Sequence, residues 1–179
     1  MIIIGIDPSL TSTGICITDE RGKVLLNQAI GSKLSGVKRL LDFKNQLMVF
    51  MNIYPLSKKM VFIESYSFGS VGKRESIAEL GGTIRLTLFE QNIEFVDVPP
   101  TVLKKYVTGK GNADKIAMGV ALQKQFGLEY PTSDQTDAFL LCELGRAYLG
   151  FIPGLAKFKE EVIADMKNPK AKKKKVAKV

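Results

Sequence analysis

Short apolar runs, separated by turn-forming residues, occupy the first 30 positions of the chain. The run MIIIGID at 1–7 is continuously apolar and rich in β-branched isoleucine, which is typical of a strand buried on both faces. It ends at Asp7, before Pro8, and the runs TGICIT at 13–18 and KVLLNQA at 23–29 follow, with a DERG turn between them. This spacing predicts three strands in an antiparallel meander.

Beyond this point, segments with helical periodicity alternate with short apolar runs. We expect a helix at about 37–53, a strand at 60–64, a loop at 65–74, a helix at about 75–91, a strand at 93–98, helices beginning at Thr101 and near Asn112, and a final helix at about 132–149. A meander followed by alternating helices and strands predicts an α/β fold. Its centre is a mixed five-stranded sheet, with three antiparallel and two parallel strands, flanked by helices.

Two of the predicted strands end on acidic residues. Asp7 closes the first strand, and Glu64 closes the run MVFIE at 60–64. A carboxylate beside a buried run is costly unless it is paired or binds a cation, although a single acid of this kind can also cap a loop. Because both strands belong to one sheet, we expect the two carboxylates at the same sheet edge.

A second acidic pair lies near the start of the last predicted helix. Asp134 and Asp137 are three residues apart, so their side chains point the same way from a helix capped by Thr132 or Ser133. Taken alone, such a pair usually faces water, because acids favour helix starts. Together with the two strand acids it predicts a cation site, since clustered carboxylates repel one another without a metal ion.

Histidine is absent from the 179 residues, which removes serine–histidine and zinc–histidine chemistry. Oxygen ligands remain, and all-carboxylate sites suit Mg²⁺ or Mn²⁺. We expect the two cysteines, Cys16 and Cys142, to be buried thiols, because both fall in apolar runs. No stretch is apolar enough to span a bilayer and no signal peptide is recognisable, so we expect a cytoplasmic protein of a bacterial or phage-infected cell, without a membrane partner.

Positive charge is concentrated at the carboxyl end. The segment 167–179 holds seven of the 26 basic side chains and no acid, whereas the other 166 residues carry 19 basic and 18 acidic side chains. We expect one folded domain at 1–166 and a disordered lysine-rich tail at 167–179. The sequence fits two roles for the tail equally: a solubilising segment, or an electrostatic tether for nucleic acid.

Four segments occur in the order found in RuvC-type Holliday junction resolvases of the ribonuclease H-like superfamily. They are GIDPSLTSTG, VFIES, LKKYVTGKGNADK and SDQTDA. The chain therefore resembles this family, its phage-type members included, over about its first 150 residues and without the lysine tail. The resemblance implies a ribonuclease H-like sheet and a homodimeric endonuclease. Such an enzyme binds four-way DNA junctions, and in some cases other branched DNA, and cuts them by paired nicks.

The resemblance also implies which residues carry the chemistry. The family's four catalytic, metal-binding acids match Asp7, Glu64, Asp134 and Asp137, which would hold two Mg²⁺ ions, with Mn²⁺ as a substitute. Two basic positions near the scissile phosphate match Lys104 and Lys115, and Lys115 joins the catalytic set. Without the motif, either lysine would be a solvated surface residue. Products with 5′-phosphate and 3′-hydroxyl ends follow from the same resemblance.

The loop after the second strand acid combines stacking faces with cations. Tyr66, Phe68, Lys73 and Arg74 suit the opened crossover of a DNA junction. In the family an aromatic residue three positions after the acid stacks on junction bases; that position is Ser67 here, and we assign the role to Phe68. The alternative is that both rings fold back onto the core.

Two further segments fit either a phosphate contact or an ordinary turn. The hydroxyl-rich hairpin of Ser9, Thr11, Ser12 and Thr13 follows the first strand acid, and Gly109-Lys110-Gly111 lets the main chain approach a ligand closely. Both segments are equally suited to making turns.

Two other functions remain open on the sequence alone. A non-catalytic branched-DNA-binding module would keep the fold and the tail but would not need all four acids. An actin-like ATPase is suggested by GIDPSLTSTG, yet such enzymes enclose the nucleotide between two related domains, and this chain has room for one.

Overall fold

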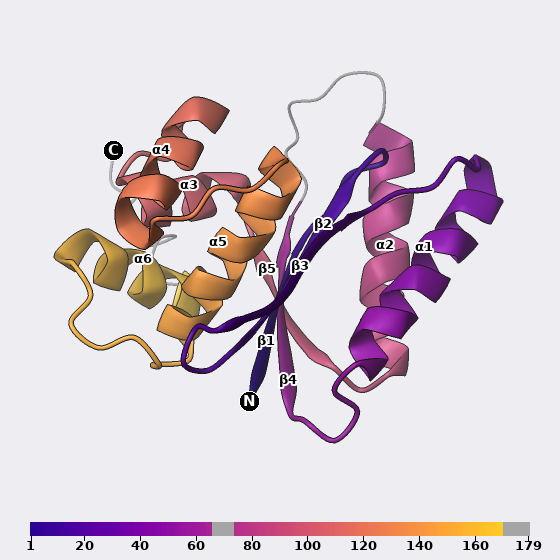
Figure 1. The fold of residues 1–179 in the computed structure, drawn as a ribbon, viewed down its shortest axis with the longest axis horizontal. Coiled ribbons are helices and arrows are strands. Elements are labelled where there is room, and N and C mark those ends of the chain that lie inside the picture. The colour runs from indigo at the N-terminus through magenta and orange to yellow at the C-terminus, as the bar shows by residue number, and fades with distance from the viewer. Residues whose placement is uncertain (66–73, 170–179) are drawn as a thin grey trace, which may run out of the picture.

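The computed structural model describes residues 1–65 and 74–169, in which one mixed sheet has the strand order β3-β2-β1-β4-β5 (Figure 1). The strands are β1 (Ile2–Asp7), β2 (Thr13–Asp19), β3 (Val24–Ile30), β4 (Lys59–Glu64) and β5 (Glu94–Val98). β2 runs antiparallel to β1 and β3, whereas β4 runs parallel to β1 and β5. The predicted meander and the two parallel strands are confirmed.

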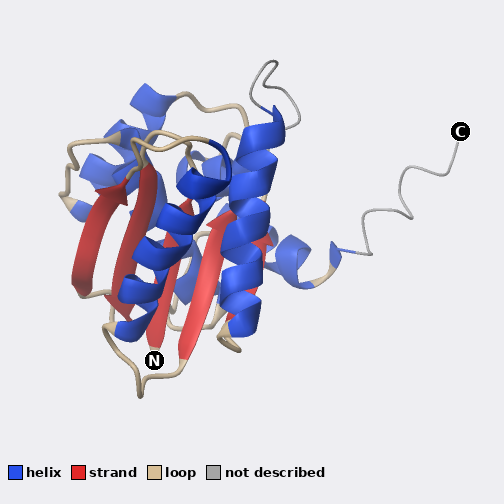
Figure 2. Cartoon of the chain, turned by 90° about the vertical axis from the view of Figure 1, so that its right-hand side faces the viewer, coloured by secondary structure: helices blue, strands red, loops and turns tan. Residues whose placement is uncertain are grey.

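Helices cover both faces of this sheet. They are α1 (Gly36–Asn52), α2 (Arg74–Glu90), α3 (Pro100–Thr108), α4 (Lys115–Phe126), α5 (Ser133–Tyr148) and α6 (Lys157–Lys167). α1 and α2 lie side by side on one face, while α5 packs over β1 and β2 on the other, with α3, α4 and α6 beside it (Figures 1 and 2). None of these helices has the length and apolar character needed to cross a membrane.

Alternate residues of β1 contribute to two separate hydrophobic cores. Ile4 and Ile6 are fully buried and pack with apolar residues of α1 and α2. Ile3 belongs to the core that α5 builds on the opposite face. Since strand side chains alternate between faces, Asp7 projects on the same side as Ile3 and Gly5, toward α5. The strand pattern therefore decides which face carries the first acid.

α5 approaches the sheet closely where β1 and β2 carry glycine. A Cβ atom on Gly5 would overlap the carbonyl oxygen of Ala138, and one on Gly14 would overlap the carbonyl oxygen of Asp134. Any larger residue would hold α5 further from the sheet. These two glycines place the start of α5 directly over the neighbouring ends of β1 and β2.

We expect Gly14→Ala to lower the free energy of unfolding by about 2 kcal/mol or more, because the added methyl would push α5 away from β2. The matched control is Gly119→Ala in α4, where an added Cβ would meet no atom within 4 Å. A glycine to alanine change at such a helical position is neutral or stabilises by up to about 1 kcal/mol. Urea denaturation measures both, and equal effects would contradict the close packing of α5.

The expected helices begin one to three residues away from their predicted starts, and two of these shifts have a local cause. α3 begins at Pro100 rather than Thr101, since proline fits the first helical turn. α4 begins at Lys115 rather than near Asn112, because the Asp114 side chain accepts a hydrogen bond from the backbone N–H of Ala117 at 2.8 Å and so caps the helix.

α6 is a helix that the apolar pattern did not lead us to expect. Its buried residues, Val162 and Ile163, join the core on the α5 side, where α6 packs against α3. Phe158, Val162 and Met166 recur every four residues, which is a helical signal in a short and mostly charged segment. The domain boundary at 166 stays a prediction.

The two cysteines are fully buried, as predicted. The Cys142 thiol of α5 donates to the carbonyl oxygen of Cys16 in β2, at a sulfur–oxygen distance of 3.3 Å. Hydrogen bonding to Cys142, followed by burial, raises the pKa of Cys16 far above its usual value. Both groups are therefore packing thiols that join α5 to the sheet.

Candidate active site

The carboxyl ends of β1 and β4 place two acids next to each other. In this parallel pair Ile6 lies opposite Ile63, so Asp7 and Glu64, the next residues, end their strands at the same level. Glu64 has the same strand parity as Phe62, which packs in the core on the α5 side. Both carboxylates therefore leave the sheet edge on the face that α5 covers.

The first turn of α5 is fixed over this edge by hydrogen bonds. Thr132 is its cap, and the Thr132 hydroxyl accepts the backbone N–H of Gln135 at 3.2 Å. The side-chain amide of Asn27, in β3, donates to the carbonyl oxygen of Gln135 at 3.1 Å. These bonds hold Asp134 and Asp137, in the same turn, at the end of the sheet where the strand acids lie.

Burial and neighbouring carboxylates raise the pKa of Asp7, Glu64 and Asp137. Burial, followed by the charges of Glu64, Asp137 and Asp134, raises the pKa of Asp7 well above its usual value. Burial, followed by Asp137, raises the pKa of Glu64 to about 7. Burial is the main cause that raises the pKa of Asp137 to about 6. Burial and neighbouring charge thus disfavour the ionised forms of Asp7, Glu64 and Asp137, which is the kind of cluster that a bound cation stabilises.

Two lysines bring the opposite charge to this cluster. The charge of Lys115, at the start of α4, lowers the pKa of Asp7, Glu64 and Asp137 against the larger effect of burial. Lys104, in α3, acts in the same sense on Glu64 and Asp137. The Lys115 ammonium donates to the Ser133 hydroxyl at 2.9 Å, which directs it toward the start of α5. Both lysines selected from the sequence therefore lie beside the acids.

The donor set suits a hard divalent cation, because all of its ligating atoms are carboxylate oxygens. The partly buried carboxylates also repel one another, and a bound cation would reduce this repulsion. Across residues 1–65 and 74–169, however, no group of three or more Asp, Glu, His or Cys side chains is arranged so that it could bind one metal ion. The backbone gathers the four acids, and their side chains do not form a closed ligand cage.

The residues selected for contact with DNA bases fall mostly outside the described part of the chain. This holds for Tyr66, Phe68 and Lys73, and for the side chain of Arg74, whose backbone begins α2. Their assignment to DNA stays a prediction.

The two segments that fit either a phosphate contact or a turn, the hairpin after Asp7 and Gly109-Lys110-Gly111, contain residues that form turns and one exposed residue. Thr13 donates its hydroxyl to the carbonyl oxygen of Ser9 at 2.8 Å and accepts the Ser9 N–H at 3.1 Å, so both residues close the β1–β2 hairpin. Thr11, at the hairpin tip, is exposed. Gly109 has a φ of 80° and ends α3, which requires glycine for the turn.

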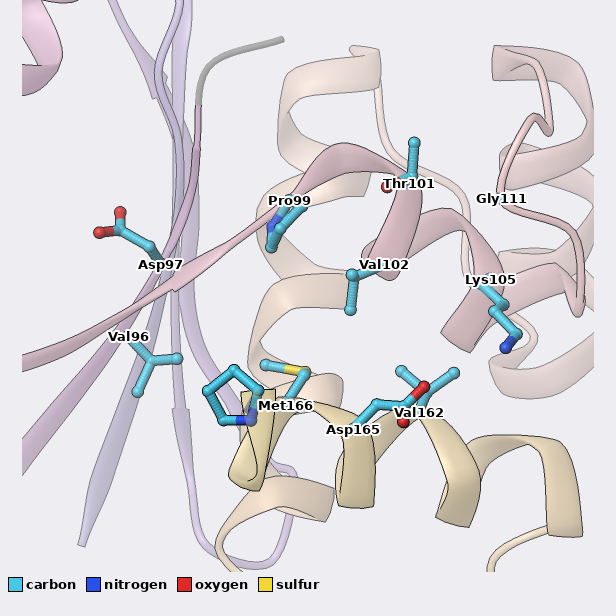
Figure 3. Close-up of a pocket in the computed structure, with 11 residues that line it drawn as sticks. Val96, Asp97, Pro99, Thr101, Val102, Lys105, Gly111, Val162, Asp165 and Met166 are labelled. Carbon is cyan, nitrogen blue, oxygen red and sulfur yellow. The ribbon is translucent and has the colours of Figure 1, made fainter. Parts of the chain in front are cut away.

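A cavity of about 510 Å³ lies between β5, α3 and α6, apart from the acid cluster (Figure 3). Val102 from α3 and Val162 and Met166 from α6 point into it, so its floor is apolar. Asp97 of β5 is also among the lining residues, but its carboxylate points away from the cavity (Figure 3) and accepts the Nε–H of Arg85, in α2, at 3.0 Å. Gly111, from the predicted Gly109-Lys110-Gly111 segment, is among its lining residues, whereas the four acids, Lys104 and Lys115 are not.

Residues 3–142 match the profile of the family described as crossover junction endodeoxyribonuclease RuvC. The chain belongs to the RuvC family. RuvC of Caldicellulosiruptor saccharolyticus is 30% identical over 142 residues, which cover 75% of this chain and 84% of that protein. RuvC of Ehrlichia canis is 30% identical over 146 residues, covering 77% of this chain and 91% of that protein. The four acids and both lysines lie inside the matched segment, whereas α6 lies beyond it.

Solved RuvC structures share the fold. The structure of RuvC from Thermus thermophilus has a TM-score of 0.69 at 18% identity, over 84% of this chain and 98% of that chain. The structure of T. thermophilus RuvC in complex with Holliday junction substrate has a TM-score of 0.63 at 17% identity, over 79% and 90% of the two chains. The ribonuclease H-like RuvC sheet predicted from the sequence is therefore confirmed.

Some contacts that build the site were not predicted from the sequence. The Lys115–Ser133 hydrogen bond joins α4 to α5. Two further hydrogen bonds, in which the side-chain amides of Asn27 and Gln135 each donate to the other residue's backbone carbonyl oxygen, join β3 to α5. Asn27 and Gln135 are 108 positions apart and carry no local pattern. The sequence pattern suggests Ser133 only as a helix cap, a role that Thr132 takes.

Proposed function

We propose that this chain is a structure-selective DNA endonuclease that resolves four-way junctions by metal-dependent cleavage, with other branched DNA as secondary substrates. The observation that carries the proposal is the convergence of Asp7, Glu64, Asp134 and Asp137 from three distant segments onto one end of the sheet. Membership of the RuvC family supports it, because that family is named for crossover junction cleavage. A DNA-binding module without catalysis would gain nothing from this costly cluster of acids.

The four acids are the proposed ligands of two Mg²⁺ ions, with Mn²⁺ as a substitute. Ions bound there supply Lewis-acid stabilisation of the charge that develops on the phosphate. Asp7 is central, since the charges of all three other acids raise its pKa, and it would contribute ligand oxygens to both ions. Glu64 and Asp134 complete the ligand sets. Asp137 adds a further oxygen and orients the attacking water.

Hydrolysis forms a bond from the water oxygen to phosphorus and breaks the bond to the 3′-oxygen, which leaves a 5′-phosphate and a 3′-hydroxyl. Lys115, directed by Ser133, supplies positive charge to the scissile phosphate, and Lys104 does the same from α3. The protein thus lowers the barrier mainly by placing charge around a fixed phosphate.

A homodimer is the proposed acting form. A four-way junction has approximate two-fold symmetry, so an isologous dimer presents two equivalent sites to two strands. On the outer side of α2, Leu86 is 57% exposed and Phe89 is 75% exposed, and large apolar side chains so exposed favour a second copy. Tyr66, Phe68, Lys73 and Arg74 are the proposed contacts to the opened crossover.

The test uses purified protein with end-labelled four-way junction, flap and linear duplex DNA, in Mg²⁺ or in chelator. We expect cleavage of the junction in Mg²⁺ and none of the duplex. A cruciform plasmid should become linear within one binding event if the dimer makes both nicks. Tight junction binding without cleavage in any metal would favour the non-catalytic module, and ATP turnover without nicking would favour the ATPase.

A further inference from the structure

A polar cavity of about 360 Å³ lies beside the β1–β2 hairpin, outside the acid cluster. Four segments line it: the hairpin, the loop before α1, α1 itself and the first turn of α2. The lining residues are Leu10, Thr11, Ser32, Arg39 and Ser76. Three hydroxyl groups and one guanidinium thus converge on this space, and none of its lining side chains among the described residues is a carboxylate, which is the composition of an anion site.

Arg39 gives this cavity its charge. Its Nε–H donates to the carbonyl oxygen of Leu34 at 2.8 Å, which fixes the guanidinium plane. Within the described residues Arg39 forms no ion pair, whereas the guanidinium of Arg146 binds Glu143. The terminal nitrogens of Arg39 are therefore open to a ligand, and their forked geometry suits phosphate oxygens.

The hydroxyls have hydrogen-bonding capacity left for an anion. Ser32 accepts the backbone N–H of Leu34 at 3.2 Å, so its own proton is free to be donated. Thr11 lies 3.3 Å from the Ser9 hydroxyl, and this pair uses only one of their two protons. Ser76 makes no side-chain hydrogen bond within the described part of the chain. All three can donate toward the same oxygen-rich ligand.

One residue that lines the cavity, Thr11, is close in sequence to the proposed catalytic residue Asp7. Thr11 follows Asp7 by four residues, which limits their Cα separation to about 15 Å. The Thr11 carbonyl lies against Gly31, where an added Cβ would come within 2.8 Å of it, so the hairpin is held against the loop that carries Ser32. Because a DNA strand advances about 3.4 Å per nucleotide along its axis, that separation spans a few nucleotides.

We propose that this cavity binds a backbone phosphate of the DNA, a few nucleotides from the scissile phosphate. The proposal rests on the proposed function, since it assigns a further contact to the same substrate. Such a contact carries no sequence information. It sets the register of the strand relative to the acids. It also explains why the hairpin keeps Thr11 exposed while Ser9 and Thr13 close the turn.

Two variants test the proposal on the intact chain. Arg39→Gln removes the charge, and Ser76→Asp puts a carboxylate into the cavity at a helix start that favours acids. We expect each to weaken junction binding in chelator by about five- to tenfold and to lower the salt slope of binding by about one. The controls are Lys38→Gln, an exposed cation on α1 that does not line the cavity, and Ser57→Asp, in the turn before β4. Both controls should change the affinity by less than about twofold.

Neutral methylphosphonate linkages, placed one at a time along the junction strands, locate the contact. One position should weaken binding of the wild-type protein and have no further effect on Arg39→Gln. Unchanged melting temperatures of the variants show that the fold is kept. Wild-type affinity in both test variants, with junction binding by the wild-type protein intact, overturns the phosphate site alone. Failure of the wild-type protein to bind branched DNA overturns both this site and the proposed function.

Discussion

Asp7→Asn is expected to reduce the rate of junction cleavage in Mg²⁺ by about a thousandfold or more. Asparagine keeps the size of the side chain but removes the negative charge of Asp7, whose pKa is raised by the charges of all three other acids. Junction binding in chelator should be equal or tighter, because one negative charge near the DNA backbone is lost. Single-turnover cleavage and a binding titration measure the two quantities separately.

The matched control for this substitution is Glu129→Gln, which removes one carboxylate from an exposed position between α4 and α5. It should leave cleavage and binding within about twofold of the wild-type values. Cleavage by Asp7→Asn at the wild-type rate would contradict the assignment of Asp7. Equal losses of cleavage and binding would point instead to a damaged fold.

The metal-free protein is expected to lose stability as the pH rises from about 4.5 to 7. The pKa of Glu64 is raised to about 7 in the folded chain, and that of Asp137 to about 6, whereas the unfolded chain has the ordinary values. In this window the folded protein binds more protons than the unfolded protein, so the free energy of unfolding falls with pH. Glu64 alone would contribute about 3 kcal/mol, and the loss is complete above its folded pKa.

Urea denaturation in chelator at pH 5 and pH 7 measures this loss, and Glu64→Gln serves as the comparison. The unfolding free energy of the wild type, relative to that of the variant, should be lower at pH 7 than at pH 5. Addition of Mg²⁺ at pH 7 should restore stability to the wild-type protein more than to Glu64→Gln. A difference that does not depend on pH would mean that Glu64 is not held among the other acids.

The elements that carry the acids were predictable because their signals are local. MIIIGID and MVFIE end on Asp7 and Glu64, and the structure ends β1 and β4 at these residues. The Asp134–Asp137 pair follows a hydroxyl cap at a helix start, and α5 begins there. Strand parity and helix spacing are short-range properties, so the sequence contains them directly.

Other features depend on tertiary contacts that no local pattern encodes. α5 sits over β1 and β2 because Gly5 and Gly14 leave room for its backbone, and a single glycine in a strand does not reveal what approaches it. α6 is mostly charged, and its position depends on burial of Val162 and Ile163 against α3. The cavity around Arg39 assembles four segments spread over positions 10–76, and its members carry no shared motif.

The central claim is that Asp7, Glu64, Asp134 and Asp137 together bind the divalent cations that support DNA cleavage. Anomalous diffraction from crystals of the protein with junction DNA and Mn²⁺ tests it most directly. The account predicts Mn²⁺ peaks at coordination distance, about 2.2 Å, from carboxylate oxygens of Asp7 and of at least two of the other three acids. Peaks elsewhere, with none at this end of the sheet in a complex that cuts DNA, would contradict it.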